Sequence, residues 1–436
     1  MPEMLKQYTF TDLSSAETKA LLKRPKMDFE AIFKNVLPVI DRVAEQGDQA
    51  VIHWNTQFDG QSADPIVCSP ATEDATLSVA VQQAIDVAFA NIEQFHRAQQ
   101  QSVLQVETMP GVTCEKHTRA IESVGLYVPG GTAILPSTAM MLAIPAMIAG
   151  CPTRVLASPP GADGKLAPEI VYIARKAGVT HLLKAGGSQA IAAMAYGTQS
   201  VPKVDKLFGP GNQYVTAAKM LVQQSEAQVS IDMPAGPSEV LIIADGQARP
   251  DFVAADLLSQ AEHGADSQVV LLFTPEFAVE ELTRQLETQL KQLPRMDLAT
   301  KALQNSFALA CPDVSTALNF SNQYAPEHLI VNVAEPENTL PSIQHAGSVF
   351  LGAYTPESVG DYASGTNHTL PTYGYARMYS GVHLASFQKS MTVQQLSTTG
   401  LQHVGPSVEI LAEREGLRAH KNAVSIRLKH LSSTHE

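Results

Sequence analysis

A chain of 436 residues is long enough for two or more domains, each with a sizeable hydrophobic core. Its 43 acidic residues outnumber its 30 basic residues, and the formal net charge of −13 argues against nucleic acid or an anionic membrane as the main partner. The 27 glycines and 27 prolines are scattered rather than clustered, which argues against a disordered or fibrous protein.

The N-terminal and apolar segments predict neither export nor a membrane span. Residues 1–10 lack a basic segment followed by an apolar run, so no secretory signal is visible. The most apolar stretch, 140–148, is far too short to cross a bilayer and contains Pro145. We expect a reduced, soluble, cytoplasmic protein without a disulfide framework. The four cysteines show no CxxC pair and no regular spacing: Cys68, Cys114, Cys151 and Cys311.

In chain order, the first 110 residues are predicted to be mostly helical and the rest of the chain to alternate strands with helices. Strand-like and helical apolar runs alternate over 123–196 and again over 239–351, which predicts βαβ units in parallel sheets covered on both faces. Two α/β domains fit this length better than one. From about residue 380 short helical pieces lead into a basic tail, 414–427, that is too short for its own core. Two apolar stripes support the helical prediction: Ile32, Val36, Ile40 and Val43, and Leu77, Val81, Ile85, Ala88, Ile92 and Phe95.

Three glycine-rich turns follow strand-like runs, at 127–131, 186–189 and 209–212. Glycine allows close backbone approach, which a phosphate or ribose needs at a strand-to-helix turn. None of the three is GxGxxG, so the usual dinucleotide fingerprint is absent. Each turn alone could be an ordinary connector, whereas the three together favour a loose nucleotide site.

The stretch Asp256 to Gly264 is a candidate metal site. If it is helical, Asp256, Gln260 and His263 share a face and Gly264 stands where a C-cap is expected. Gln260 and His263 could then both direct a ligand atom at one metal ion. The alternative is a solvated helix end.

Glu327 and His328 form a candidate acid–base pair. They follow Tyr-Ala-Pro and precede the strand-like run 329–333, so they stand at a loop–strand junction. Both can reach one pocket only if the turn is irregular, because neighbouring strand residues point to opposite faces. His328 could act as a general base near neutral pH and Glu327 could activate water, while an ordinary surface pair remains the alternative.

Three further groups could be functional or structural. The polar loop 361–368 carries Asp361 and His368 and has too few apolar residues for a core. Glu415 and His420, in the tail, would by themselves be read as a solvated face. Cys151 could suggest thiol catalysis, but no histidine or lysine lies nearby in sequence to lower its pKa, which favours a buried structural thiol.

Eight strings in order along almost the whole chain give a strong resemblance to the histidinol dehydrogenase family. They are VGLYVPGG, KLFGPGN, IDMPAGPSEV, DLLSQAEHG, YAPEHL, AGSVFLG, GDYASGTNHTLPTYGYAR and AHKNAVSIR. The resemblance implies oxidation of L-histidinol to L-histidine through L-histidinaldehyde, with reduction of two NAD⁺. It also implies one bound zinc ion per subunit.

The resemblance also implies a role for individual residues. Glu327 and His328 match the family's acid–base pair. The zinc ligands carry over onto Gln260, His263, Asp361 and, from the partner subunit, His420. Substrate contacts, besides the four zinc ligands, carry over onto Ser238, His328, Tyr362, His368 and Glu415. The NAD contacts carry over onto Tyr127, Gln189 and Asn212.

This ligand set is chemically reasonable for an ion that orients a substrate. Zinc usually takes histidine, cysteine and carboxylate, and an amide oxygen is a weaker ligand. Two imidazoles, a carboxylate and an amide leave room for the amine and ring nitrogen of an amino alcohol that bears an imidazole. Mixed nitrogen and oxygen ligation also makes Mn²⁺ or Co²⁺ plausible substitutes.

We therefore expect an α/β protein with two Rossmann-like domains, each with an incomplete dinucleotide-binding topology. The first domain, 26–126 with 238–380, would carry the metal and acid–base residues, and the second, 127–237, would bind NAD. A helical arm, 1–25, would precede them. A tail domain, 381–436, would pack on the partner subunit of a homodimer and complete its active site.

Two rival interpretations remain for the sequence. One is a zinc hydrolase in which Glu327 and metal-bound water act and the glycine turns are mere connectors. The other is a non-catalytic nucleotide- or metal-binding scaffold, which would bind ligands without turnover. A four-residue ligand set that includes glutamine favours a holding site over a hydrolase, and an intact Glu327-His328 pair argues against a scaffold.

Overall fold

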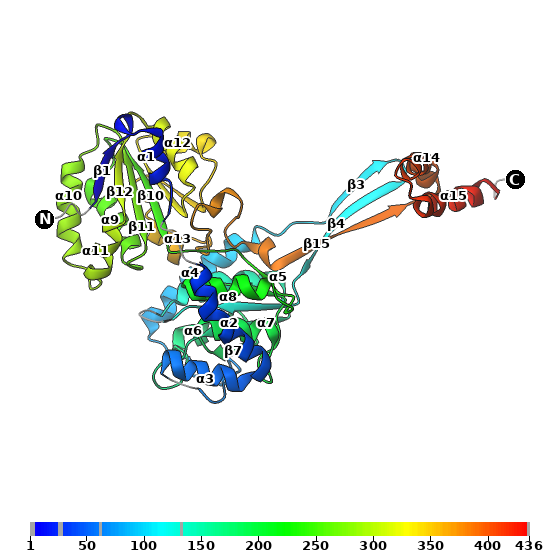
Figure 1. Ribbon diagram of the computed structural model, residues 1–436, viewed down its shortest axis with the longest axis horizontal. Helices are drawn as coiled ribbons and strands as arrows, with labels where there is room; N and C mark the ends of the chain where they lie inside the picture. Colours follow the sequence, from blue (N-terminus) through cyan, green and yellow to red (C-terminus); the bar gives the residue numbers. More distant parts are fainter. Residues whose placement is uncertain (1–4, 25–28, 61–62, 131–133, 434–436) are drawn as a thin grey trace. The chain divides into compact units, whose positions relative to one another are not determined.

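The computed structural model describes residues 5–24, 29–60, 63–130 and 134–433 (Figure 1). By internal contacts the chain divides into two compact units. The large unit comprises Met1–Gln99 and Ile121–Phe387, and the small unit comprises Gln100–Ala120 and Gln388–Glu436. Among the described residues, no helix has both the length and the apolar character needed to cross a membrane.

The large unit contains two six-stranded sheets, which we call sheet A and sheet B. Every strand pair in sheet A is parallel. Its strands, in spatial order, are β1 (Lys6–Thr9), β12 (Phe307–Ala310), β11 (Gln268–Phe273), β10 (Glu239–Ala244), β13 (His328–Asn332) and β14 (Ser348–Leu351). The helices of this half are α1 (Ser15–Leu21), α9 (Pro250–Ala261), α10 (Val279–Leu290), α11 (Met296–Gln304), α12 (Val314–Tyr324) and α13 (Glu357–Tyr362).

Sheet A is buried on both faces, which explains its uninterrupted apolar strands. Val240 and Ile242 belong to a core cluster with residues of α9, α10 and α11. The alternate residues Leu241 and Ile243 belong to a second cluster with residues of α12. Helices on both faces are the expected covering for a parallel sheet.

Sheet B has five parallel strands and one antiparallel edge strand, β2. Its strands, in spatial order, are β2 (Val67–Cys68), β7 (His181–Lys184), β6 (Thr153–Ser158), β5 (Ser123–Tyr127), β8 (Lys206–Phe208) and β9 (Ser230–Ile231). Its helices are α2 (Phe29–Gln46), α3 (Asp48–Asp59), α4 (Val79–Arg97), α5 (Pro136–Ala149), α6 (Pro168–Lys176), α7 (Gly187–Tyr196) and α8 (Gln213–Gln223). Helix α2 packs on α7 and α8, and α5 packs between α4 and α6.

Both sheets have the same order of strands. In sheet A, the strands β10 to β14, numbered 1 to 5 in chain order, lie in the spatial order 3-2-1-4-5, and β1 adds to the edge. In sheet B, the strands β5 to β9 lie in the same order, and β2 adds to the edge. This is the Rossmann order without its sixth strand. The predicted fold class, two Rossmann-like halves with an incomplete dinucleotide-binding topology, is therefore confirmed.

The structure places the N-terminal third of the chain differently from our expectation. We assigned 26–126 to the half that carries sheet A, but α2 and α3 join the core of sheet B and β2 pairs with β7. The predicted stripe Ile32, Val36, Ile40 and Val43 is real and buried in that core. Such a stripe indicates a helix but does not indicate which sheet it covers. The expected helical arm, 1–25, also contains a strand, β1, which extends sheet A.

The small unit is a three-stranded antiparallel sheet followed by two helices. The strand order is β15 (Gln388–Leu396), β4 (Val112–Ala120), β3 (Leu104–Met109), and the helices α14 (Thr398–Arg414) and α15 (Arg418–Ser433) pack together. A Cβ on Gly405 would lie 2.9 Å from a methyl group of Leu428, so the glycine allows the two helices to approach closely. We expected only short helical pieces after 380 and assigned 100–120 to an α/β domain. Both expectations were wrong, because these two distant segments pair as strands.

Candidate active site

Glu327 and His328 lie at the amino end of sheet A. His328 is the first residue of β13 and pairs with Val240, so Glu239, the first residue of β10, is its neighbour. Helix α12 ends at Tyr324, and its C-cap Ala325, with a φ of 54°, turns the chain sharply before Pro326. The turn before the strand is therefore irregular. An irregular turn is what we expected to be necessary for the Glu327 and His328 side chains to reach one pocket. Ligands in doubly wound sheets usually bind at the carboxyl ends of strands, and this site is at the opposite edge.

Both residues of the pair are hydrogen-bonded to the backbone of Glu239. The Glu239 N–H donates to Glu327 Oε2 at 2.8 Å, and His328 Nδ1 lies 3.0 Å from the Glu239 carbonyl oxygen. A carbonyl only accepts, so in the neutral ring Nδ1 carries the hydrogen and Nε2 is the acceptor nitrogen. His328 Nε2 is buried without a hydrogen-bond partner, 3.5 Å from Asp361 Oδ1. This is the atom that could take a proton from a substrate.

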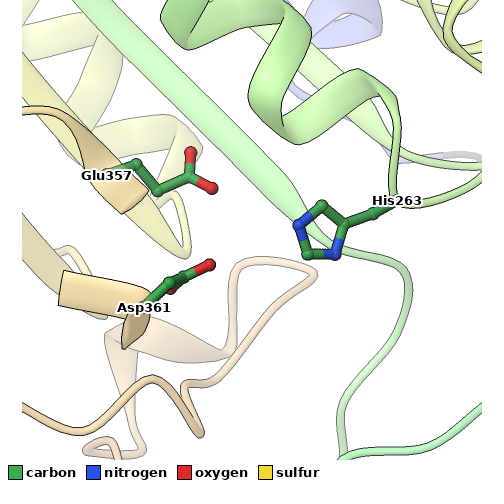
Figure 2. Close-up of side chains that lie close together, drawn as sticks. All are labelled: His263, Glu357 and Asp361. Carbon is green, nitrogen blue, oxygen red and sulfur yellow. The ribbon is translucent and has the colours of Figure 1, made fainter. Parts of the chain in front are cut away.

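A second group of side chains comes together beside this pair. His263, Glu357 and Asp361 each offer one ligand atom, and these atoms lie within 4.8 Å of one another. Figure 2 shows the three side chains turned toward a common space. Glu357 and Asp361 share a face of α13 because they are four residues apart, and His263 follows the end of α9.

Gln260 contacts Glu357 from the last turn of α9. With its amide nitrogen toward Glu357, it donates to both carboxylate oxygens, at 2.7 and 3.2 Å. The opposite orientation would place the amide oxygen against two acceptors. Helix α9 ends at Ala261 rather than extending to a cap at Gly264, so His263 lies just beyond the helix instead of in its last turn. Asp256 does share the buried side of α9 with Gln260.

Burial and mutual repulsion shift the pKa values of these carboxyl groups. Burial raises the pKa of both Glu327 and Glu357 to about 8, and that of Asp256 to about 7. Burial would lower the pKa of His328, but the nearby carboxylates, Glu327 first, outweigh it and raise that pKa well above its usual range. Burial opposes ionisation of Asp361 as well, yet the close contact with the His328 ring and the positive charge of that ring lower its pKa. Several carboxyl groups therefore surround the His328 imidazole, and a bound cation would stabilise their ionised forms.

The remaining predicted substrate contacts of the large unit are Ser238, Tyr362 and His368. Ser238 precedes Glu239, and Tyr362, which is exposed, follows Asp361. His368 donates from Nδ1 to the Asp361 carbonyl at 2.9 Å, and its Nε2 lies 3.1 Å from the hydroxyl of Thr138 on α5. It therefore connects the site loop to a helix of the sheet B half.

Glu415 and His420 lie in the small unit. Glu415 caps the C-terminus of α14 and His420 is in the first turn of α15, and both side chains are exposed.

A cavity of about 1120 Å³ lies at the carboxyl ends of β5, β6 and β7. Tyr127, Gln189 and Asn212, the three predicted NAD contacts, all line it. Strand order reverses between β5 and β8, so the cavity occupies the switch point where doubly wound folds bind their ligands. Part of the first glycine turn, residues 131–133, lies outside the described residues.

The polar groups of this cavity are set by local structure. The Tyr127 hydroxyl accepts from the Gly187 N–H at 3.0 Å, and the Asn212 side chain caps α8. Gln189 donates to Asn55 at 3.2 Å, while its buried Oε1 has no partner. A Cβ on Gly209 would lie 2.0 Å from the Tyr127 carbonyl oxygen, so only glycine fits this turn.

Cys151 is fully buried, and its thiol contacts the Phe387 carbonyl at 3.6 Å. Burial raises the pKa of this thiol to about 11, so it is scarcely ionised near neutral pH. The prediction of a buried thiol is confirmed.

Sequence reasoning missed Glu357 and Glu239. Glu357 could have been found from its spacing, because it precedes the candidate ligand Asp361 by one helical turn. Glu239 contacts the pair through its backbone, and a backbone contact of this kind leaves no pattern of side chains in the sequence.

Two doubly wound sheets, one with a large cavity at its switch point and the other with a cluster of imidazole and carboxylate groups, are the architecture of an α/β enzyme. Comparison with known proteins identifies its family. The model of the histidinol dehydrogenase family matches residues 22–428, and the chain belongs to this family.

Individual relatives agree with this assignment. A chloroplastic histidinol dehydrogenase of Arabidopsis thaliana is 57% identical over 98% of this chain and 92% of its own. A histidine biosynthesis trifunctional protein of Komagataella pastoris is 53% identical over 96% of this chain and 50% of its own. The crystal structure of histidinol dehydrogenase from Elizabethkingia anophelis superposes with a TM-score of 0.95 at 48% identity, covering 99% of this chain and 100% of that one.

Proposed function

We propose that the protein oxidises L-histidinol through L-histidinaldehyde to L-histidine, with two NAD⁺ reduced in turn, as the last part of histidine biosynthesis. The observation that carries this proposal is the buried His328 Nε2, which has no hydrogen-bond partner and lies beside a cluster of carboxylates in a chain of the histidinol dehydrogenase family. An alcohol oxidation needs a base at the hydroxyl and a cofactor for the hydride, and the two halves of the large unit offer a site for each.

A divalent cation fits the cluster on chemical grounds. One imidazole and two carboxylates, with an amide nearby, are a donor set that zinc accepts, and Asp361 Oδ1 is buried without a hydrogen-bond partner. We propose that Gln260, His263 and Asp361 hold zinc together with His420 of the partner subunit, and that Glu357 supports them. When bound, the ion would orient the substrate and keep the surrounding carboxylates ionised.

His328 and Glu327 would share the proton transfers. His328 Nε2 takes the alcohol proton in the first oxidation, since Nδ1 is committed to the Glu239 carbonyl. A positive charge at the carboxylate cluster would counter the groups that raise the pKa of His328 and return the ring to a neutral base. In the second oxidation Glu327, with His328, activates the water that adds to the aldehyde. Ser238, Tyr362, His368 and, from the tail, Glu415 would hold the substrate.

We assign NAD⁺, the hydride acceptor, to the cavity of sheet B. Support comes from its place at the switch point and from Tyr127, Gln189 and Asn212 in its lining. Gln189→Ala should raise the KM for NAD⁺ and leave the KM for L-histidinol unchanged, whereas Gln223→Ala, at the exposed end of α8, should change neither. Equal effects of the two substitutions would place the cofactor elsewhere.

We also propose a homodimer in which the small unit of each chain completes the site of the other. The small unit buries little of its own surface: β3 is exposed throughout, and no described residue of α15 is buried. Ile410, Leu411 and Ile426 expose more than half of their side chains, which are candidates for burial against a second chain. The expected cytoplasmic location remains a prediction, and two plant relatives are named as chloroplastic.

Absorbance of NADH after addition of NAD⁺ and L-histidinol to the zinc-loaded protein tests the proposed activity. Steady formation of NADH is the expected result. Turnover of an ester or amide substrate without NADH would favour the hydrolase, and ligand binding without any turnover would favour the scaffold.

A further inference from the structure

Among the described residues, Glu239 is the one whose backbone is hydrogen-bonded to both members of the acid–base pair. Its N–H donates to Glu327 Oε2 at 2.8 Å, and its carbonyl oxygen accepts from His328 Nδ1 at 3.0 Å. The direction of these two backbone groups therefore decides where the Glu327 carboxylate lies and which nitrogen of His328 is left for the substrate.

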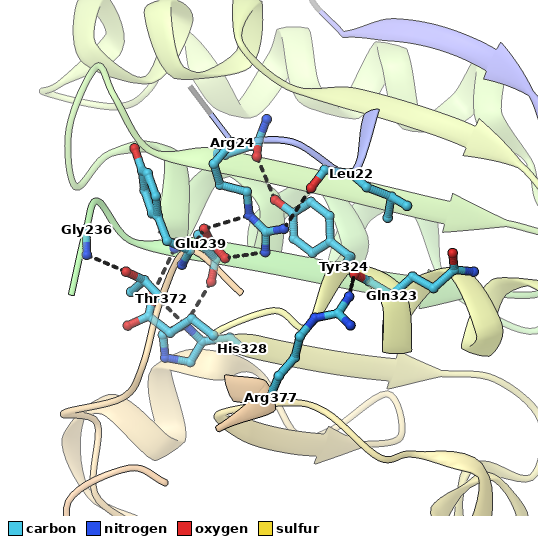
Figure 3. Close-up of polar contacts among 12 residues, drawn as sticks. Leu22, Arg24, Gly236, Glu239, Gln323, Tyr324, His328, Thr372 and Arg377 are labelled. Carbon is cyan, nitrogen blue, oxygen red and sulfur yellow. Dashed lines mark hydrogen bonds and ion pairs between the residues drawn. The ribbon is translucent and has the colours of Figure 1, made fainter. Parts of the chain in front are cut away.

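The Glu239 side chain itself accepts three hydrogen bonds, from two residues. Arg24 donates to it through two parallel hydrogen bonds, Nε to Oε1 and Nη2 to Oε2, both 2.9 Å long. The Tyr373 N–H also donates to Oε1, at 2.9 Å. The Arg24 and Glu239 side chains are only 7% and 1% exposed. Figure 3 shows this network with the His328 ring beneath it.

Arg24 is fixed in turn by an aromatic ring. Its guanidinium carbon lies 3.3 Å from the centre of the Tyr324 ring, and the Tyr324 hydroxyl donates to Gln268 at 2.6 Å. The fork of an arginine matches a carboxylate in one plane, so a bidentate pair restricts orientation more strongly than a single contact does. Three segments far apart in the sequence thus meet at the first residue of β10.

We propose that the Arg24–Glu239 pair is a positioning device for catalysis, which fixes the backbone of residue 239 and through it the geometry of Glu327 and His328. Stability alone does not require such a pair, because well-packed apolar residues often replace a buried ion pair without loss. The inference rests on the proposed function for its kinetic consequences, but the geometry of His328 can be tested without any substrate.

The kinetic test compares Arg24→Met, Arg24→Lys and the double variant Arg24→Met/Glu239→Leu with the wild type. A displacement of about 1 Å in a catalytic group costs on the order of 10²-fold in rate, so we expect kcat to fall by about that factor in Arg24→Met and in the double variant, at unchanged KM for L-histidinol. Arg24→Lys keeps the charge without the fork and should lose less. Both oxidation steps should slow, because the first depends on His328, the second depends on Glu327 with His328, and both residues depend on the same anchor.

The double variant separates positioning from the cost of an unpaired buried charge, since it removes both charges together. Glu73→Gln is the matched control: Glu73 pairs with Lys184 in sheet B, with side chains 13% and 9% exposed. It should lower the melting temperature and leave kcat unchanged. Wild-type kcat in a folded double variant would overturn the proposal and leave the pair a structural role only.

The substrate-free test is the ¹⁵N spectrum of the His328 ring in the zinc-loaded protein, where the cation is expected to keep the ring neutral. The signals are assigned by their absence in His328→Asn. The wild type should show a protonated Nδ1, and Arg24→Met and the double variant should show a mixture of tautomers. An unchanged tautomer in both variants would contradict the proposal. If the wild type forms no NADH from L-histidinol but the tautomer does change, the proposed function fails and the positioning role stands.

Discussion

Glu357 and Asp361 lie one turn apart on the six-residue helix α13, and both carboxylates face His263. Two buried acids on a short helix would repel each other, and burial raises the pKa of Glu357 to about 8. The Gln260 amide nitrogen donates to Glu357, which fixes the direction of the whole Gln260 amide. Glu357 is thus placed to hold a ligand residue in position and to add charge to the cation site.

Substitution of Glu357 tests this role. Outer-shell partners of metal ligands typically contribute about 10- to 100-fold in metal affinity, and we expect Glu357→Gln to weaken zinc binding by at least that order. Competition with a chelating dye measures the affinity directly. Glu337→Gln, at an exposed position beyond β13, is the matched control and should bind zinc like the wild type. Unchanged affinity in Glu357→Gln would remove this residue from the site.

The two members of the acid–base pair should fail differently. His328→Asn removes the base for both oxidations, whereas Glu327→Gln mainly removes the activation of water in the second. General acid–base catalysis typically contributes about 10²- to 10⁴-fold, which sets the expected size of each loss. Rates measured separately from L-histidinol and from L-histidinaldehyde distinguish the steps. An equal loss of both rates in Glu327→Gln would refute the division of labour.

The metal-free protein should become less stable as the pH rises. Burial raises the pKa of Glu327 and Glu357 from 4.5 to about 8 and that of Asp256 from 3.8 to about 7. Between these values the folded protein holds more protons than the unfolded chain, so the free energy of unfolding falls with rising pH. The raised pKa of His328 acts in the same direction, and the lowered pKa of Asp361 acts only at more acidic pH. Burial lowers the pKa of His96, His263 and His368 from 6.5, which opposes the trend in the acidic part of this range.

Melting temperatures of metal-stripped protein between about pH 5 and pH 8, the window between the unfolded and folded pKa values, measure this effect. Zinc should flatten the curve and release protons on binding, because it replaces them at the carboxylates. A melting temperature that rises with pH in the stripped protein would show that these carboxyls are already ionised in the fold.

A mixing experiment tests the exchange of tails between subunits. His420→Ala and His263→Ala chains should each be inactive alone. After dissociation and reassociation, a heterodimer holds one intact site and one doubly altered site. Random pairing makes half of the dimers heterodimers, so about a quarter of the wild-type activity should return. If none returns, the tail serves its own subunit.

Several features of the site could be predicted because they are local in sequence. Gln260 and His263 are three residues apart, and Glu327 and His328 are adjacent, so the structure only had to bring these short groups near Asp361. The alternation of strands and helices likewise predicted two covered parallel sheets, since βαβ units are local.

The features that could not be predicted depend on contacts between distant segments. Arg24 and Glu239 are 215 positions apart, and no local sequence pattern pairs them. The strand 388–396 is predominantly polar and exposed, so no apolar run in the sequence predicts it. The segment forms a strand because it pairs with 112–120. Helix α2 showed its apolar stripe clearly, but any apolar sheet face could have received it.

The central claim, a zinc-dependent oxidation in two steps at one site, is tested most directly by the number of NADH formed per L-histidinol consumed. The protein is first stripped of metal and then given Zn²⁺. The account predicts two NADH per histidinol with zinc and none without it. One NADH with release of free aldehyde would contradict the second step and the role of Glu327, and NADH formation without metal would contradict the role of the cluster.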